Sequence, residues 1–387
     1  MATDEVRILD DLDEAGAERW DALRSPASTP FTRFAWLSAL EKSGCAAPRS
    51  GWQPRHLTLW RKGNLVAAAP AWAKDDSDGD FARDWDLASA SSGARLRYYP
   101  KLALTVPFTP CTGERILVAP GEDRQKATER LVRAALDLCR EHSYATFQAL
   151  FPDEEGAGEL EQAGLASRVS YQFHWTNQGY QSMDDFLARF NSKRRHMLRR
   201  EMRAAEEQGV TIRTVRGEEL LRDPARWAKV AHALHRNTVD KLMWGRRWLN
   251  EKFYQLAFAA MPDAMEVVVA ERDGEIIAGA FNVSSSTRLY GRYWGCFEEL
   301  PFLHFNVCYY HSIKDCIARG LSVFEGGAGG EHKLSRGFLP SLTYSAHAFL
   351  DARLDRGLRE HLRMETPERE RSILRFSQES PIFKAAP

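Results

Sequence analysis

Cysteine is scarce in this sequence, which has six cysteines in 387 residues and no Cys-x-x-Cys pair. They are Cys45, Cys111, Cys139, Cys296, Cys308 and Cys316. Disulfide frameworks and zinc sites need cysteines at close, regular spacings. This scattering indicates reduced thiols in a cytoplasmic protein and predicts no metal site.

Long apolar runs and an excess of charge are also missing. No stretch of 18 apolar residues is present, so we expect no membrane-spanning helix. The acidic start "MATDEVRILDDLDEAG" has neither the basic nor the apolar region of a signal peptide. Lys+Arg and Asp+Glu both total 53, so any site for a polyanion must be local.

The common nucleotide loops are absent as well. The stretch "FEGGAGGEHKLSRGF" (324–338) has four glycines, but Glu331 and His332 separate them from Lys333, and no Ser or Thr follows it. A Walker loop requires the lysine directly after the last glycine. The dinucleotide loop fails too, because Gly337 and Pro340 end the following segment before a helix can form. No G-x-S-x-G elbow occurs, so covalent catalysis has no support.

A repeated pattern indicates two α/β units. "WRKGNLVAAAP" (60–70) and "ERDGEIIAGAF" (271–281) each predict a hairpin with a tight turn, at Gly63 and Gly274. In both halves a short apolar segment that contains proline comes next, "VPFTP" (106–110) and "LPFLHF" (300–305). A helix is predicted after each of them, near 123–142 and near 306–319.

Each of these helices leads to an apolar strand, at 144–150 and at 321–327. A hairpin, strand, helix and strand used twice indicate a duplicated α/β unit. We predict one domain over 1–165, a second over 166–350, and a charged, partly helical, peripheral tail over 351–387.

The glycine-rich stretch needs a physical reason, because glycine loses more conformational freedom on folding than other residues. One reason is close approach of the backbone to a ligand, with Lys333 and Arg336 supplying positive charge. A surface loop with solvated charges is the alternative.

Basic residues are concentrated in "NSKRRHMLRREMR", on a helix expected to start at Ser182 or Asp184 and to stop at Gly209. The cations are Lys193, Arg194, Arg195, Arg199, Arg200 and Arg203. They are expected to form a band beside an apolar stripe of Phe186, Phe190 and Met197. The band suits a polyanion, although a solvated helix face is the usual fate of such runs.

Several other ionisable residues have open interpretations. His304 is a candidate proton acceptor or a packing residue, and Glu325 and Glu331 either take a proton from an ammonium or tie the loop together. His232 and His235 have no acid at ligand spacing, so a helix surface or core edge is expected for them.

The order of these segments resembles the GCN5-related acyltransferase (GNAT) fold used twice, as in the Fem family of peptidoglycan aminoacyl transferases. It is most similar to the Fem-like bacterial N-acyltransferases. The stretches that carry the resemblance are "FTRFAWLSALEKSG", "GWQPRHLTLW", "RYYPKLALTVPFTPCTG", "FHWTNQGYQSMDDFLARFNSKRRHMLRRE", "GRYWGCFEELPFLHFNVCYY" and "EGGAGGEHKLSRGFLPSLTYSAH".

The resemblance implies an α/β protein of two tandem GNAT-like domains with mixed sheets, in a Fem-like arrangement. It implies an N-acyl or aminoacyl transferase whose glycine loop covers the substrate, with Gly326–Gly327 and Gly337–Phe338 as the matching pairs. The family's lysine corresponds to Lys333 or to Arg336. The expected catalytic residues are Lys333, Glu331, Glu325 and His304. The expected substrate-binding residues are Gly326, Gly327, Arg336, Arg292, Trp294, Tyr309, Lys193, Arg195, Arg199 and Arg200.

The acyl donor is open between acyl-CoA and aminoacyl-tRNA, with no tightly bound cofactor expected. Neither candidate connector carries the [QR]-x-x-G-x-[GA] loop that holds the pyrophosphate of acetyl-CoA. Its absence is shared with Fem-type enzymes that use charged tRNA. The acceptor is expected to be a small-molecule or peptide amine. The alternatives are a non-catalytic recognition module for a peptidoglycan precursor or other anionic ligand, and a coenzyme A-dependent acetyltransferase with a degenerate loop.

Overall fold

The computed structural model describes residues 4–241, 243, 245–378 and 382–383, without the side chains of residues 331, 377 and 378. The chain forms two compact units. Unit 1 consists of Met1–Tyr171 and Leu342–Ser372, and unit 2 of Gln172–Ser341 and Ile373–Pro387. The segment 342–372 therefore lies with the first unit.

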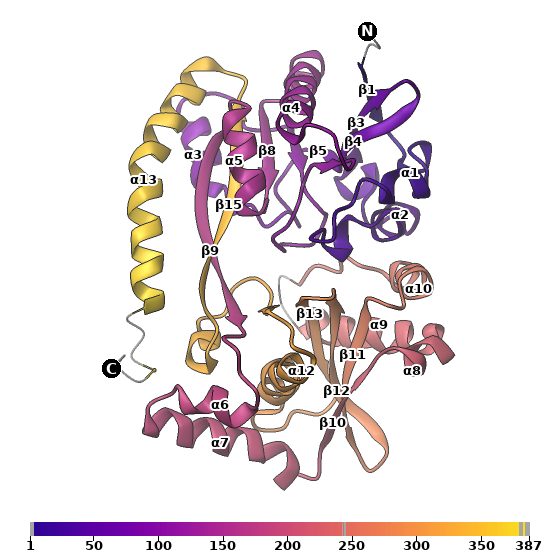
Figure 1. Ribbon diagram of the computed structural model, residues 1–387, viewed down its shortest axis with the longest axis vertical. Coiled ribbons are helices and arrows are strands. Elements are labelled where there is room, and N and C mark those ends of the chain that lie inside the picture. The colour runs from indigo at the N-terminus through magenta and orange to yellow at the C-terminus, as the bar shows by residue number, and fades with distance from the viewer. Residues whose placement is uncertain (1–3, 242, 244, 379–381, 384–387) are drawn as a thin grey trace. The chain divides into compact units, whose positions relative to one another are not determined.

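Unit 1 contains two sheets (Figure 1). The antiparallel sheet β1-β3-β4-β7 is formed by β1 (Asp4–Leu9), β3 (His56–Arg61), β4 (Asn64–Ala69) and β7 (Leu117–Val118). The mixed set β2-β5-β6-β8-β15 is formed by β2 (Gln53–Pro54), β5 (Ala71–Lys74), β6 (Lys101–Leu104), β8 (Thr146–Leu150) and β15 (Leu339–Phe349). The helices are α1 (Ala17–Asp21), α2 (Phe34–Lys42), α3 (Trp85–Gly93), α4 (Arg124–Glu141), α5 (Glu154–Gln162) and α13 (Ala352–Gln378).

Unit 2 contains a mixed set of strands in the order β10-β11-β12-β13-β14-β9. They are β10 (Thr211–Val215), β11 (Met265–Arg272), β12 (Glu275–Ser284), β13 (Arg288–Cys296), β14 (Val323–Glu325) and β9 (Ala166–Thr176). The helices are α6 (Met183–Ala188), α7 (Ser192–Glu207), α8 (Glu218–Arg222), α9 (Pro224–Lys241), α10 (Glu251–Ala260), α11 (Leu303–Phe305), the π-helix η4 (Asn306–His311), α12 (Ser312–Arg319) and the 3₁₀ segment η5 (Glu331–Arg336).

Both predicted hairpins are confirmed. β3 pairs with β4, and β11 pairs with β12, each antiparallel. Both turn residues have positive φ, at Lys62 (50°) and Gly63 (78°) and at Asp273 (53°) and Gly274 (83°). This is the backbone of a type I′ turn, whose twist matches that of the flanking strands.

The predicted order of strand, helix and strand is present in both units, but the strands before the helices are β6 and β13 rather than the proline-containing segments. β6 and β8 pair in parallel around α4, and β13 and β14 pair in parallel around α11–α12. In each unit the strand at the end of the order pairs antiparallel with the strand after the crossover helix. Residues 174–176 of β9 pair with β14, and residues 345–349 of β15 pair with β8. The two units therefore share one mixed α/β plan.

The single helix predicted between Ser182 and Gly209 is two helices. Ser182 caps α6, and Asn191 caps α7 by accepting a hydrogen bond from the N–H of Arg194. A side chain that accepts from the first turn of a helix fixes a new start there. The predicted apolar stripe also differs, because Met197 is 43% exposed whereas its neighbour Leu198 is buried.

The helix predicted at 306–319 contains the π-helix η4 in its first half. A π turn rotates the following side chains relative to an α-helix and often occurs at functional sites. Tyr309 and Tyr310, both in η4, reach different partners: Tyr309 contacts His332, and Tyr310 donates to Glu201.

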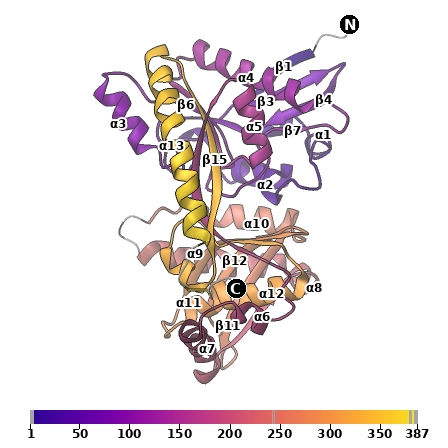
Figure 2. The same cartoon turned by 60° about the vertical axis from the view of Figure 1, so that its left-hand side comes forward.

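The charged tail predicted after residue 350 is the helix α13. Figure 2 shows it running beside β15. Leu358 and Leu362 are buried with Phe349 and Tyr98 in a hydrophobic cluster of unit 1. The first half of α13 is therefore part of the core of that unit rather than a peripheral tail.

Candidate functional site

Lys333 contacts the glycine loop of unit 2, which we define as residues 326–330. The loop follows β14, and Lys333 lies in η5 with 3% of its surface exposed. Its Nζ donates hydrogen bonds to the carbonyl oxygens of Gly327, at 2.7 Å, and Gly329, at 2.6 Å. The lysine therefore points inward and fixes the path of the loop.

This bracing sets the direction of two backbone N–H groups. In a trans peptide the C=O and the N–H point in opposite directions. Because the carbonyls of Gly327 and Gly329 point toward Lys333, the N–H groups of Ala328 and Gly330 point away from it. Within the described part of the chain, neither of these N–H groups donates to another group. Backbone N–H groups without an internal acceptor can bind an oxyanion or another anion.

The loop requires glycine at several positions. Gly327, Gly329 and Gly330 have φ values of 81°, 79° and 92°, a region that side-chain-bearing residues rarely adopt. A Cβ on Gly327 would also lie 3.5 Å from the carbonyl oxygen of Gly291 in β13. Three of the four glycines thus serve the backbone conformation of the loop, which the sequence alone suggested without specifying.

Arg336 also points inward. Its Nη2 lies 2.8 Å from Oε2 of Glu201 in α7, and its guanidinium carbon lies 3.3 Å from the centre of the Phe305 ring. Only 5% of its surface is exposed. The family resemblance predicts cations that face the substrate, but the hydrogen bonds of Lys333 to two carbonyls and the ion pair of Arg336 lie inside unit 2. Glu201 was not singled out from the sequence, because it lies within a basic run.

His304 and His332 lie beside the loop among aromatic rings. The ring centre of His304 is 5.0 Å from that of Trp294 and 6.0 Å from that of His332. Tyr309 and Nε2 of His332 are 3.0 Å apart, at hydrogen-bond distance. A Cβ on Gly330 would clash with the His332 ring at 2.8 Å, so this imidazole lies against the loop.

Both imidazoles are neutral near pH 7. Burial, together with nearby His332, Arg336 and Lys333, lowers the pKa of His304 to about 4. Burial, followed by Lys333 and Arg336, also lowers the pKa of His332. Neutral imidazoles can accept a proton, which is what an attacking amine must lose.

Glu325 ends β14 immediately before the glycines and is 1% exposed. Its Oε1 lies 3.1 Å from Nη1 of Arg288, and its Oε2 lies 3.9 Å from Nε2 of His174. Burial lowers the pKa of His174, so this imidazole is neutral as well. Arg288 and His174 were not singled out from the sequence.

The remaining candidates are placed as follows. The side chain of Glu331 lies outside the described residues. Arg292 stacks on Tyr293, with 5.6 Å between its guanidinium carbon and the ring centre. His235 is buried in α9, and burial lowers its pKa to about 3. Among the described residues no group of three His, Cys, Asp or Glu is arranged to hold a metal ion.

The cations of α7 lie mostly on the surface. Lys193, Arg199 and Arg200 are exposed, and Arg195 is half-buried. Arg199 pairs with Asp184 at 2.9 Å. In the described part of the chain, Lys193, Arg195 and Arg200 form no ion pair with a side chain.

Similarity to the solved structure of FemX supports this fold, and two further structures resemble the chain more weakly. FemX shares 12% sequence identity with the chain, with a TM-score of 0.53, over 92% of this chain and 100% of its own. L-PGS from Bacillus licheniformis shares 10% identity, with a TM-score of 0.48, over 86% and 96%. A tandem GNAT protein from the clavulanic acid biosynthesis pathway shares 12% identity, with a TM-score of 0.43, over 90% and 98%. At such identities the likeness concerns the fold alone.

A family model gives the classification. No curated protein matches the chain in sequence. No helix among the described residues has the length and apolar character needed to cross a membrane. The FemAB-like model, described as peptidoglycan biosynthesis/recognition, matches residues 11–384. The chain therefore belongs to the FemAB-like family and has its double GNAT-like fold.

Proposed function

We propose that the protein is an N-acyl or aminoacyl transferase that forms an amide bond between an activated acyl donor and an amine acceptor. The donor is an aminoacyl-tRNA or an acyl-CoA. Family membership supports the class of reaction. The observation that carries the proposal is the bracing of the glycine loop by Lys333, which presents the N–H groups of Ala328 and Gly330.

These two N–H groups would stabilise the reaction's charged intermediate. An amine that attacks an ester or thioester carbonyl generates a tetrahedral oxyanion. Preorganised N–H donors aimed at that oxygen stabilise it more than the neutral carbonyl, and losing one such donor costs about 10²–10³-fold in turnover. Lys333 contributes by holding the loop, and its charge adds a favourable potential.

The attacking amine must also lose a proton, and we assign its acceptance to His304. This imidazole is neutral, lies 6.0 Å from His332 between ring centres, and belongs to the group of rings beside the loop. His332 and Tyr309, joined by their 3.0 Å contact, provide a route for that proton. The leaving oxygen or sulfur of the donor is protonated as the carbonyl reforms.

The surface of α7 supports a polyanionic donor. Lys193, Arg195 and Arg200 are available to phosphates, and cations of this kind release counterions when they bind nucleic acid or a diphosphate. Both tRNA and coenzyme A meet this requirement. We propose that α7 holds the phosphates of the donor.

The test uses the full-length protein with a mixture of charged tRNAs or with acyl-CoAs, a set of amines and muropeptides, and mass spectrometry of amide products. Product formation that is lost in Lys333→Met and retained in Lys314→Met, an exposed lysine of α12, is the expected result. The Lys314→Met variant controls for the loss of a positive charge in the same unit.

The family description also names recognition. Binding of a peptidoglycan precursor or another anionic ligand without any amide product from either donor would favour the recognition module. Product from acyl-CoA alone would favour a coenzyme A-dependent acetyltransferase.

A further inference from the structure

Lys101 and Arg288 occupy the same place in their respective units. Lys101 begins β6 and pairs in parallel register with Thr146 of β8. Arg288 begins β13 and pairs in the same way with Val323 of β14. The two cations are therefore equivalent by strand order and register.

The residues that contact these cations are equivalent too. Gln148 lies two residues beyond Thr146, and Glu325 lies two residues beyond Val323. Nζ of Lys101 donates to Oε1 of Gln148 at 3.1 Å, and Nη1 of Arg288 donates to Oε1 of Glu325 at 3.1 Å.

A histidine completes each row. Gln148 pairs with His347 of β15, and Glu325 pairs with His174 of β9. Each histidine places Nε2 near the side chain two residues earlier: Ser345 at 2.8 Å and Gln172 at 3.4 Å. Burial lowers the pKa of both histidines. We call Lys101–Gln148–His347 the unit 1 row and Arg288–Glu325–His174 the unit 2 row.

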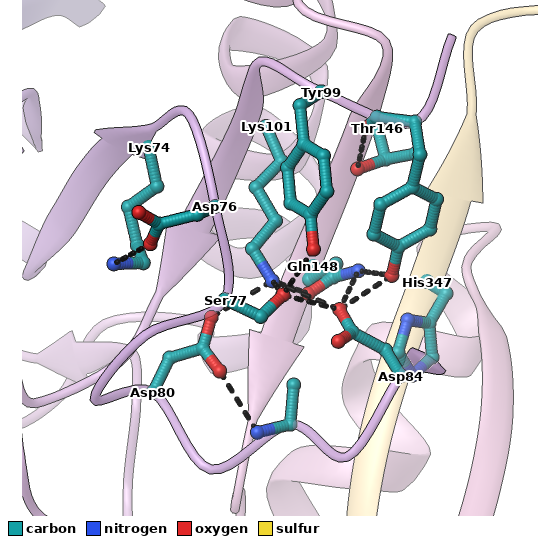
Figure 3. A network of polar contacts seen from close by, with 12 residues as sticks. Lys74, Asp76, Ser77, Asp80, Asp84, Tyr99, Lys101, Thr146, Gln148 and His347 are labelled. Carbon is teal, nitrogen blue, oxygen red and sulfur yellow. Dashed lines mark hydrogen bonds and ion pairs between the residues drawn. The ribbon is translucent and has the colours of Figure 1, made fainter. Parts of the chain in front are cut away.

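The unit 1 row is enclosed by the segment between β5 and β6. This segment brings Asp80 and Asp84 onto Lys101, with carboxylate oxygens at 2.8 Å and 2.9 Å from Nζ, as Figure 3 shows. Ser77 also accepts a hydrogen bond from Nζ, at 2.6 Å. The Lys101 side chain has no exposed surface. Burial alone would lower its pKa, but the two carboxylates raise it, so the ammonium stays charged.

Among the described residues, no segment comparable to the one between β5 and β6 covers Arg288 of the unit 2 row. The connection from β12 to β13 is a tight turn, in which the N–H of Ser285 donates to the carbonyl of Arg288 at 2.9 Å. The Arg288 side chain is 39% exposed. Strand β8 continues beyond Gln148 through Ala149 and Leu150. In contrast, β14 ends at the equivalent residue, Glu325, and is followed by Gly326 and Gly327.

We propose that the two rows are copies of one site, that the unit 1 copy is closed and purely structural, and that Arg288 is a positioning residue of the open copy. This inference rests on the proposed function of the glycine loop. Arg288 neutralises and orients the buried Glu325 carboxylate, and so fixes the end of β14 from which Gly326 and Gly327 depart. Loss of the guanidinium would remove the positive charge that offsets the cost of burying this carboxylate.

The test compares Arg288→Met, Arg288→Lys and Lys101→Met with the wild type, in the amide-forming assay and by thermal unfolding. Arg288→Met should lower kcat at least tenfold, with the KM for the donor within about threefold and a smaller loss in Tm than Lys101→Met, because the Arg288 side chain is partly exposed. Arg288→Lys should restore most of kcat, because a lysine occupies this register position in unit 1.

Lys101→Met should behave in the opposite way. It leaves Asp80 and Asp84 buried without their counter-ion, so Tm should fall by about 10 °C while the kcat of the folded protein stays within twofold. If this variant fails to fold, Lys101→Met combined with Asp80→Asn and Asp84→Asn removes the charges together, and should fold with normal kcat.

Full kcat in Arg288→Met, or no recovery in Arg288→Lys, would overturn the positioning role. A lowered kcat at unchanged Tm in Lys101→Met would overturn the closed copy. If the wild type forms no amide, the proposed function fails on its own. The Tm comparison still decides whether the unit 1 row is the structural one, because a small loss in Lys101→Met contradicts it.

Discussion

Arg336 and Glu201 form a buried ion pair, with 2.8 Å between Nη2 and Oε2. The pair joins η5, which follows the glycine loop, to the basic helix α7. Tyr310 of the π-helix donates to the same carboxylate oxygen. One acidic residue thus ties together three segments around the candidate site.

Removing one partner of this pair should destabilise the protein. Arg336→Met leaves the Glu201 carboxylate buried without its counter-ion, so we expect a loss of about 3–5 kcal/mol in the free energy of unfolding. Urea denaturation measures this loss. The double variant Glu201→Leu/Arg336→Met should recover most of it. Arg272→Met breaks a partly exposed pair with Glu298 in the same unit and should cost about 1 kcal/mol or less. Equal losses in Arg272→Met and Arg336→Met would contradict the buried-pair interpretation.

Lys333→Met should act on turnover more than Arg336→Met does. Without Nζ the carbonyls of Gly327 and Gly329 lose their shared donor, and the opposed N–H groups lose their direction. We expect a fall of about 10²-fold in kcat, the scale of one lost oxyanion donor. Steady-state kinetics of amide formation measure it. Normal kcat in Lys333→Met would remove the bracing role.

A side chain at Gly327 should disturb the loop without disturbing the core. Gly327→Val imposes strain at φ 81°, costing about 1–2 kcal/mol or more locally, and should lower kcat by about 10²–10³-fold. The matched control is Gly274→Val in the β11–β12 turn, where φ is 83° and no atom lies within 4 Å of the added Cβ. Both variants should lose similar amounts in Tm, and only Gly327→Val should lose activity. An equal loss of activity in both would indicate a general folding defect.

The basic surface of α7 should set the salt dependence of donor binding. Replacing Lys193, Arg195 and Arg200 with Ala should weaken binding of tRNA or coenzyme A and flatten the slope of log K against log salt. Stability should change little, because exposed charges contribute little to folding. Arg356, Arg363 and Arg375, exposed on α13, form the control triple. An unchanged salt slope in the α7 triple would leave these charges as a solvated helix face.

His347 should make stability depend on pH. Burial lowers its pKa to about 4, with Arg168 and Lys101 adding to the effect. In the unfolded chain His347 has its ordinary pKa of 6.5 and binds a proton below that pH. In the native state it binds a proton only when the pH falls to about 4. Stability is therefore lost as pH falls from 6.5 to 4, by about 3 kcal/mol for this residue. His347→Gln should reduce the loss between pH 7 and pH 4.5 in urea denaturation, whereas His142→Gln, on the surface, should leave it unchanged. The same pH dependence in both variants would contradict this assignment.

Local signals in the sequence determined much of the fold. Lys62–Gly63 and Asp273–Gly274, each between apolar runs, specify type I′ turns by backbone sterics alone. The 3.6-residue apolar spacing in 123–142 specified the crossover helix α4. The family order of segments then identified the double GNAT-like plan, and the glycine run marked the loop near which His304, Trp294, Tyr309, Lys333 and Arg336 are found.

Tertiary structure decided what the charged side chains do. Lys333 and Arg336 are both cationic and three residues apart, so sequence could not distinguish a brace for two carbonyls from a partner of Glu201, which lies far away in the chain. The pairing of Arg288 with Glu325, and of Lys101 with Gln148, depends on strand register that appears only when the sheets form. Burial, which sets the pKa of His304 and His347, is likewise a property of the packed chain. The sequence determines local backbone conformation and apolar pattern, whereas the direction and the partner of each ion are decided by long-range packing.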